Sequence, residues 1–211
     1  MGRLSVHLIR GGALPRSLIT VALLAVSAPT FGTNLLINGG FESGNSGFSS
    51  EYIYSYDMDA YGEGKYYVGS NPRDHNPQFF DMGAEEGSLM MIVNGALQPD
   101  VIVWRESGIA VQPHTTYDFS AWVADVSGLE AAVVRVSING TPLGTMTPAP
   151  AIWHEFRFTW DSGSNVSADV ILVDLNTDWS GNDFAIDDMT LDQMPTATAK
   201  STWGHIKDIY R

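Results

Sequence analysis

Three aspartates, Asp183, Asp187 and Asp188, lie close together in residues 181–191. The same stretch alternates apolar residues as a β-strand with one buried face does, and these are Phe184, Ile186, Met189 and Leu191. Aspartate is rare in strands because its side chain competes for backbone hydrogen bonds, and a buried carboxylate needs a partner. Adjacent strand residues face opposite sides, so Asp187 and Asp188 are not expected to form the facing pair of a glycosidase. The pattern favours a bound cation.

Motifs of other catalytic classes are absent from the sequence. It has no cysteine, no Gly-x-Ser-x-Gly segment, no His-Glu-x-x-His segment and no phosphate-binding loop. Three histidines, His75, His114 and His154, are isolated in the sequence, and a lone histidine beside a turn is usually solvated or caps the backbone. We therefore expect no enzymatic activity, and at most an association with glycoside hydrolysis.

Aromatic residues supply candidates for a different chemistry, the binding of sugars. A sugar-binding site needs flat aromatic platforms together with amide, carboxylate or guanidinium groups for the hydroxyls. The candidate platforms are Trp104, Trp122, Tyr54, Tyr56 and Trp179, and the candidate hydrogen-bonding groups are Arg105, Asn94 and Asp118. The alternative for each tryptophan is packing in the core or at a sheet edge.

Length and composition limit the classes of partner. With 211 residues, of which 44% are hydrophobic, the chain is long enough for one well-packed domain and short for two. A formal net charge of −13 argues against a nucleic-acid partner, because an acidic surface repels phosphate. The lack of cysteine excludes disulfides, so stability has to come from the core and from any bound metal.

The first 32 residues resemble a secretory signal peptide. Arg3, Arg10 and Arg16 precede an apolar run over residues 18–26, and small residues follow as far as Gly32. We expect cleavage after Gly32, giving a secreted or cell-surface protein with no membrane span in the mature chain. A transmembrane anchor is the alternative, although the apolar run is shorter than the roughly 20 residues that a span requires. Residues 194–211 form a linker and a basic tail, which is either a packed helical turn or a sorting signal.

Short alternating runs bounded by turn residues predict an all-β domain over residues 33–193. A short apolar strand is expected at the start of residues 34–42, ending in the turn at 38–40. The other expected strands are 89–93, 101–106, 116–123, 132–138, 155–160, 168–175 and 184–191, with turn signals such as Asn139-Gly140 between them. In 116–123 the alternation places Tyr117, Phe119, Ala121 and Val123 on one face and Trp122 on the other. Residues 43–88 are rich in tyrosine and glycine, and we expect them to form a long functional loop.

Five short motifs occur in an order that resembles the galactose-binding-like sandwich of carbohydrate-binding modules of families 4, 9 and 22. They are Asn38-Gly39-Gly40-Phe41-Glu42, Glu86-Gly87-Ser88-Leu89-Met90, Tyr117-Asp118-Phe119-Ser120-Ala121-Trp122, Trp153-His154-Glu155-Phe156 and Phe184-Ala185-Ile186-Asp187-Asp188. Gly47-Phe48-Ser49-Ser50 adds a likeness to exported bacterial surface modules. The resemblance implies a jelly-roll β-sandwich of two antiparallel sheets over residues 34–193.

The resemblance also implies a structural calcium that connects the first strand to the last. Position by position it nominates the carboxylates of Glu42, Glu86 and Asp187, with a backbone carbonyl near Gly40. Such a set agrees with the preference of Ca²⁺ for six to eight oxygen ligands. The alternative is that these acids are only solvated. In sugar-binding relatives the strand that contains Trp104 carries a tryptophan of the binding cleft.

The function expected from these observations is that of a non-catalytic, monomeric, calcium-stabilised module. It would bind a glycan or a cell-surface polysaccharide. Two alternatives stay open: a structural or adhesive extracellular module that binds protein or matrix, and an accessory protein of a glycoside hydrolase.

Overall fold

The computed structural model describes residues 33–58 and 63–195. The signal peptide expected in residues 1–32 and most of the expected tail lie outside the described residues. Ten strands and one short 3-10 helix make up the regular structure of the described ranges: β1 (Ile53–Tyr54), β2 (Lys65–Gly69), η1 (Pro72–Asp74), β3 (Met90–Asn94), β4 (Ile102–Ala110), β5 (Thr116–Asp125), β6 (Val134–Ile138), β7 (Thr141–Met146), β8 (His154–Asp161), β9 (Ser167–Asp174) and β10 (Phe184–Gln193).

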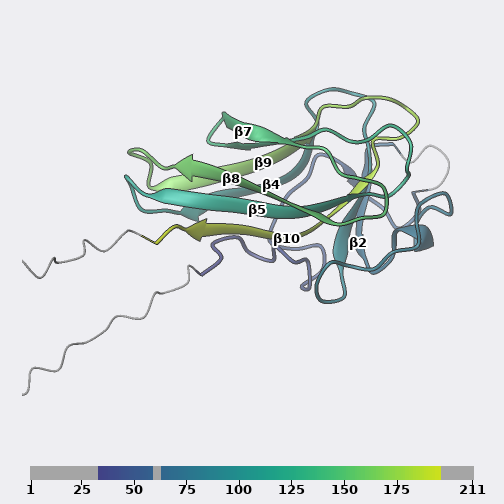
Figure 1. Ribbon diagram of the computed structural model, residues 1–211, viewed down its shortest axis with the longest axis horizontal. Helices are drawn as coiled ribbons and strands as arrows, with labels where there is room; N and C mark the ends of the chain where they lie inside the picture. The colour runs from purple at the N-terminus through teal and green to yellow at the C-terminus, as the bar shows by residue number, and fades with distance from the viewer. Residues whose placement is uncertain (1–32, 59–62, 196–211) are drawn as a thin grey trace, which may run out of the picture. The chain divides into compact units, whose positions relative to one another are not determined.

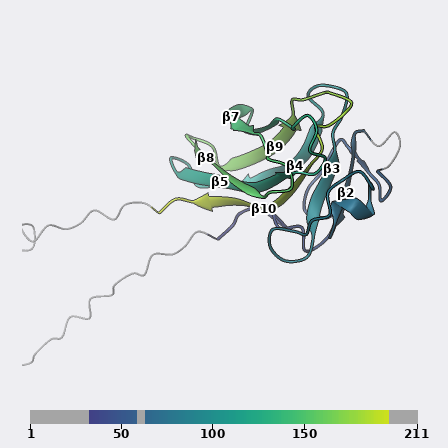
Figure 2. The same ribbon diagram turned by 45° about the vertical axis from the view of Figure 1, so that its right-hand side comes forward.

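The strands form two sheets. The larger sheet has the order β1-β2-β3-β10-β5-β8, and the smaller has the order β4-β9-β6-β7. Figure 1 shows β8, β5 and β10 side by side, and Figure 2 shows β2 and β3 adjacent at the other end of that sheet. Every strand pair is antiparallel except β1 with β2. The expected all-β jelly-roll sandwich is therefore confirmed.

The main core lies between the two sheets. On β5 the side chains of Tyr117, Phe119, Ala121 and Val123 are buried in it, so the predicted alternation of this strand is confirmed. Trp122 consequently faces outward. Two-sheet packing of this kind buries one face of each strand and leaves the other face free for a ligand or a covering loop.

The seven strands predicted between residues 89 and 191 are present, and β1, β2 and β7 are additional. The short apolar strand predicted at the start of residues 34–42 is wrong, because residues 36–40 form a bend and a turn. The β7 sequence contains Pro142 and Gly144, which weaken a strand signal and are tolerated here because β7 is the edge strand of its sheet. A Cβ on Gly144 would overlap the ring of Phe158 in β8, so close packing between the sheets accounts for this glycine. The Asn139-Gly140 turn between β6 and β7 has positive φ at both residues, as the sequence predicted.

A second, smaller core covers the outer face of β3. Met82 and Ala84 pack against it, and the buried side chains that meet there are Met58, Phe79, Met90, Ile92, Val126 and Ala185. Every residue of β3 is therefore buried. The expected long loop is thus partly a strand, β2, and partly a cover for the sheet, which explains why it carries so many aromatic residues.

A β-bulge in β10 explains the acidic composition of that strand. The pairing of β10 with β5 shifts between Asp187 and Thr190, and Asp188 has a positive φ of 41°. One extra residue changes the facing of all later side chains. Ile186 before the bulge and Met189 after it therefore both point into the main core, and the two aspartates lie at the bulge itself.

The N-terminal segment pairs with β10 directly beyond the bulge. The amide of Leu35 donates to the carbonyl of Leu191 (3.0 Å), and the amide of Met189 donates to the carbonyl of Gly39 (3.0 Å). A Cβ on Gly39 would overlap the carbonyl oxygen of Met189. Only glycine therefore permits this approach of the two backbones.

Gly39→Ala is expected to lower the free energy of unfolding by about 1–3 kcal/mol, because the added methyl group forces the N-terminal segment away from β10. Chemical denaturation of the full chain measures the effect. Gly83→Ala is the matched control, since a Cβ on Gly83 would have nothing within 4 Å. Equal stability of the two variants would show that the segment does not depend on this contact.

Candidate functional site

Asp187 is wholly buried, and its carboxylate accepts hydrogen bonds only from backbone amides in the described residues. The amides of Glu85 and Glu86 donate to Oδ2 (2.9 and 3.4 Å), and that of Asp188 donates to Oδ1 (2.8 Å). Burial outweighs these bonds and raises the pKa of Asp187 to about 7. The partner that the sequence required for this carboxylate thus includes the 85–86 backbone.

Glu42 binds the same loop from the N-terminal segment. Its Oε1 accepts hydrogen bonds from the amides of Ser88 and Leu89, both at 2.7 Å. These two bonds hold the pKa of Glu42 below its ordinary value. Residues 85–89 are therefore connected to β10 through Asp187 and to the first segment through Glu42.

The bulge brings a further acid, Asp188, to this place. Burial, a hydrogen bond with Glu85 and the negative charges of Glu85 and Glu42 raise the pKa of Asp188 to about 6. The expectation that Asp187 and Asp188 point apart is wrong, because the bulge interrupts the strand alternation. The carboxyl group beside Asp188 belongs to Glu85, whereas the side chain of the expected Glu86 is exposed.

These four acids, Glu42, Glu85, Asp187 and Asp188, have the chemistry of a site for a hard cation. All four ion pairs found in residues 33–58 and 63–195 involve other carboxylates. Gly40 lies against Asp187 and Asp188, since a Cβ on Gly40 would come within 2.9 Å of Asp188 Oδ1 and 4.0 Å of Asp187 Oδ1. In the same ranges no three acidic or histidine side chains form a ready-made metal centre. Carboxylate oxygens are the ligands that Ca²⁺ prefers. In this structure the carboxylates of Glu42 and Asp187 accept hydrogen bonds from backbone amides.

The outer face of β10, β5 and β8 carries the second candidate site. Half-buried Trp122 lies between Asp187 of β10 and Glu155 of β8, its cross-strand neighbours. Two residues earlier on β5, Ser120 shares a hydrogen bond with Thr190 (2.8 Å). The predicted outward position of Trp122 therefore places an indole ring among polar groups from three strands.

Charged side chains on this face are held in position. Arg157 of β8 forms an ion pair with Asp118 of β5 (2.9 Å) and another with Glu155. Asp192 of β10 pairs across the sheet with Asp118, and its buried Oδ1 has no hydrogen-bond partner in the described residues. A buried acceptor without a donor costs about 1–3 kcal/mol, and because this oxygen is buried it is not open to a ligand on the face.

Trp104 is not on this face, which corrects the expectation of a cleft tryptophan. It is wholly buried in the main core, where it stacks on Phe48 with ring centroids 6.2 Å apart. Arg105 faces outward from the smaller sheet, where Asp169 binds it at 2.6 Å. It is therefore separated from Trp122 by the thickness of the sandwich. Asn94 is 9% exposed and donates to the carbonyl of Met58 (3.1 Å), so it is not open to a ligand either.

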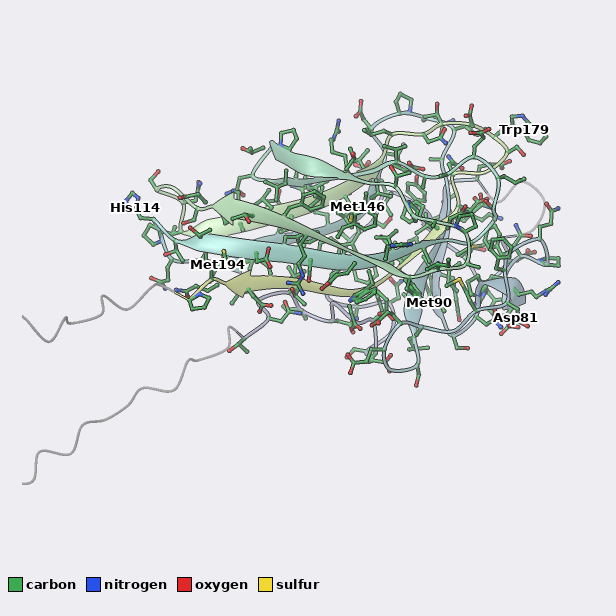
Figure 3. All side chains as sticks on the ribbon, in the orientation of Figure 1. Asp81, Met90, His114, Met146, Trp179 and Met194 are labelled. Carbon is green, nitrogen blue, oxygen red and sulfur yellow. The ribbon has the colours of Figure 1, made fainter. Side chains whose placement is uncertain are left out.

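Tyr54 and Tyr56 lie together at the β1 edge of the larger sheet. Tyr54 stacks on Tyr67 with ring centroids 4.9 Å apart, and Tyr56 packs edge-on against both Tyr67 and His75. Trp179 is 79% exposed and projects from the loop before β10, at the end of the molecule away from His114 (Figure 3). The nominated aromatic residues therefore do not converge on one surface.

Two more buried aspartates give the protein an expected pH dependence. Burial raises the pKa of Asp174 to about 6 and that of Asp183 to about 7, from an ordinary value of 3.8. The folded state thus binds these protons more tightly than the unfolded state, and the resulting stability is lost as pH rises through about 6–7. With a chelator present, the melting temperature is expected to be higher at pH 5 than at pH 8. An equal or higher value at pH 8 would contradict this, and Asp183→Asn should reduce the difference.

No protein-family model matches the chain, and a comparison with curated proteins found no match. Solved structures do match. The tandem CBM22-1–CBM22-2 domain of Xyn10C from Paenibacillus barcinonensis is 16% identical, with a TM-score of 0.53, over 83% of this chain and 49% of that one. The chain has the fold of a carbohydrate-binding module.

An enzyme shares this fold. A cyclase from Fischerella sp. TAU, solved in complex with 4-(1H-indol-3-yl)butan-2-one, is 14% identical, with a TM-score of 0.54, over 76% of this chain and 96% of that one. At such identities the likeness concerns the fold alone. The function has to be argued from the side chains on the sheet.

Proposed function

We propose that the chain is a secreted, non-catalytic module that binds a glycan on the outer face of β10, β5 and β8. The observation that carries the proposal is the position of Trp122, half-buried beside the polar side chains of Glu155 and Arg157 on the outer face. Aromatic rings bind the apolar face of a sugar ring, and fixed polar groups bind its hydroxyls. A sheet face offers both at regular spacing.

Preorganisation supports this face over the other exposed aromatic groups. Arg157 is held by two carboxylates, so a ligand meets a charged side chain whose orientation is already fixed. Trp179 is more exposed, but it projects from a loop.

The charge of the face favours a neutral glycan. Asp118, Glu155 and Asp192 lie on it with Arg157, whose charge two of these acids already balance. A polysaccharide of uronic acids would bring further negative charge against these carboxylates, and like charges suppress binding.

Affinity electrophoresis of the full chain tests the proposed function. Gels containing neutral xylan, β-glucan or mannan are compared with gels containing polygalacturonate. At least one neutral polymer should retard the protein, and polygalacturonate should not. If none of the neutral polymers retarded the protein, the proposal would be overturned. The structural or adhesive alternative would then be favoured, in which the exposed side chains of Tyr54 and Tyr56 contact protein or matrix.

Calcium is the second part of the proposal. Glu42, Asp187, Asp188 and Glu85 would hold it, with a carbonyl near Gly40, and the ion would neutralise acids that otherwise repel one another. It would connect the N-terminal segment, the 85–89 loop and β10. Its role is structural, because Asp187 is closed to solvent and the acids contact the scaffold.

Addition of a chelator at pH 7.5 is expected to lower the melting temperature, and excess Ca²⁺ should restore it, since an ion that binds only the folded state stabilises it by mass action. Differential scanning calorimetry of the full chain measures this. Glu42→Gln should weaken the response, because one ligand loses its charge. A melting temperature that does not change with chelator or Ca²⁺ would exclude the metal.

Export is proposed from the signal-like residues 1–32. No helix among the described residues has the length and apolar character needed to cross a membrane.

A further inference from the structure

Three buried aspartates lie at the end of the sandwich where β5 and β9 end and β10 begins. Asp125 ends β5, Asp174 ends β9, and Asp183 immediately precedes β10. Their exposed fractions are 1%, 3% and 8%. They belong to neither the Glu42–Asp187 site nor the Trp122 face, and they come from strands of both sheets.

Backbone contacts bring these strand ends together. The amide of Val126, next to Asp125, donates to the carbonyl of Asp183 (3.2 Å). The amide of Gly95 donates to Asp183 Oδ1 (3.2 Å), and that of Val133 donates to Asp174 Oδ1 (3.0 Å). The charges of Asp125 and Asp174 both act on the pKa of Asp183, in addition to its burial. Asp183 therefore lies within electrostatic reach of the other two.

Asp125 and Asp174 each have one carboxylate oxygen that lacks a hydrogen-bond donor among the described residues. The Oδ1 atom of Asp125 accepts from the amides of Ser127 and Gly128, both at 2.8 Å, and that of Asp174 from Val133 and Asn176. The Oδ2 atoms of both residues are buried and have no hydrogen-bond partner within the described ranges. A buried charge is normally paired or coordinates a metal.

Protein cations do not supply the missing partner. The arginines that form ion pairs in the described part of the chain are Arg105, Arg135 and Arg157, and none of their partners is Asp125, Asp174 or Asp183. The hydroxyl group of Tyr52 lies within electrostatic reach of these acids, because the charges of Asp174 and Asp183 help to raise its pKa. Its oxygen accepts a hydrogen bond from the amide of Ala96 (3.0 Å). It adds a neutral oxygen to the carboxylates.

We infer that Asp125, Asp174 and Asp183 form a second cation site, separate from the Glu42–Asp187 site, which binds Ca²⁺ at this end of the sandwich. The donors are all oxygens, which suits a hard cation, and Ca²⁺ tolerates irregular shells better than Mg²⁺. The three carboxyl groups do not form a ready-made metal centre in the described residues. The unengaged Oδ2 atoms allow them to turn toward a common ion while each Oδ1 keeps its backbone amides.

Equilibrium dialysis of the full chain against radioactive CaCl₂ at pH 7.5 tests the inference. The variant Asp125→Asn/Asp174→Asn should bind one ion fewer than the wild type, or bind it about tenfold more weakly or worse. Asp100→Asn is the matched control, because Asp100 is 74% exposed and pairs only with Arg135 on the surface. It should bind as the wild type does.

Glu42→Gln separates the two sites. It should lose the ion of the Glu42–Asp187 site and keep the one at Asp125 and Asp174. If Glu42→Gln bound no calcium, or if the double variant bound as much as the wild type, the second site would be excluded. If Glu42→Gln bound as much as the wild type while the double variant lost an ion, the first site would fail and the second would stand. The Glu42→Gln result decides the question even if the double variant does not fold.

Discussion

Trp122→Ala is expected to weaken glycan binding by about thirtyfold, which corresponds to about 2 kcal/mol. The ring is the one large apolar surface that we place against the sugar, and its removal leaves the surrounding carboxylates and Arg157 without a platform. Isothermal titration calorimetry with an oligosaccharide of the polymer that retards the protein measures the loss. Stability should change little, because Trp122 belongs to neither core.

Trp179→Ala is the matched control for this loss. Trp179 is a more exposed tryptophan than Trp122, but it lies on a loop and has no part in the proposed site. Its variant should bind as tightly as the wild type. If Trp179→Ala lost affinity and Trp122→Ala kept it, the ligand would bind at the end of the sandwich and not on the sheet face.

Trp104→Ala, unlike Trp122→Ala, is expected to lower the stability of the fold. The free energy of unfolding should fall by about 3–5 kcal/mol. The ring is wholly buried between the sheets and packs on Phe48, so truncation leaves a large cavity in the main core. Urea denaturation measures the loss. A protein near the usual stability of 5–15 kcal/mol would be severely weakened.

Trp104→Phe distinguishes packing from any polar role of the indole. The Nε1 atom of Trp104 has no hydrogen-bond partner in the described residues, so its removal should cost little, and the phenyl ring refills part of the space. We expect less than half of the loss seen with alanine. An equal loss for both variants would mean that the indole nitrogen has a partner, and normal folding of Trp104→Ala would contradict its place in the core.

The contrast between these two tryptophans shows what the sequence could predict. Alternation on β5 is regular, so it correctly placed Trp122 opposite a buried face. On β4 the pairing with β9 shifts between Ile102 and Trp104, and Val103 and Trp104 are both buried. Simple alternation fails at such an irregularity, and nothing in the local sequence marks it.

The acidic strand shows the same limit. The aspartates indicated that Asp187 needed a specific partner, and it has one in the described structure, but the partner is the backbone of residues 85–86. Backbone amides leave no side-chain signal in a sequence. The bulge that brings Asp188 to Glu85 was also hidden, because an extra strand residue is visible only through its pairing.

A ligand on the Trp122 face is the central claim, and the indole N–H signals of the six tryptophans test it directly by NMR. During titration of the full chain with the neutral oligosaccharide, the Trp122 signal should shift while the signals of Trp104 and Trp179 stay in place. Shifts confined to Trp179, or no indole shift with the Tyr54 and Tyr56 signals moving instead, would contradict the claim.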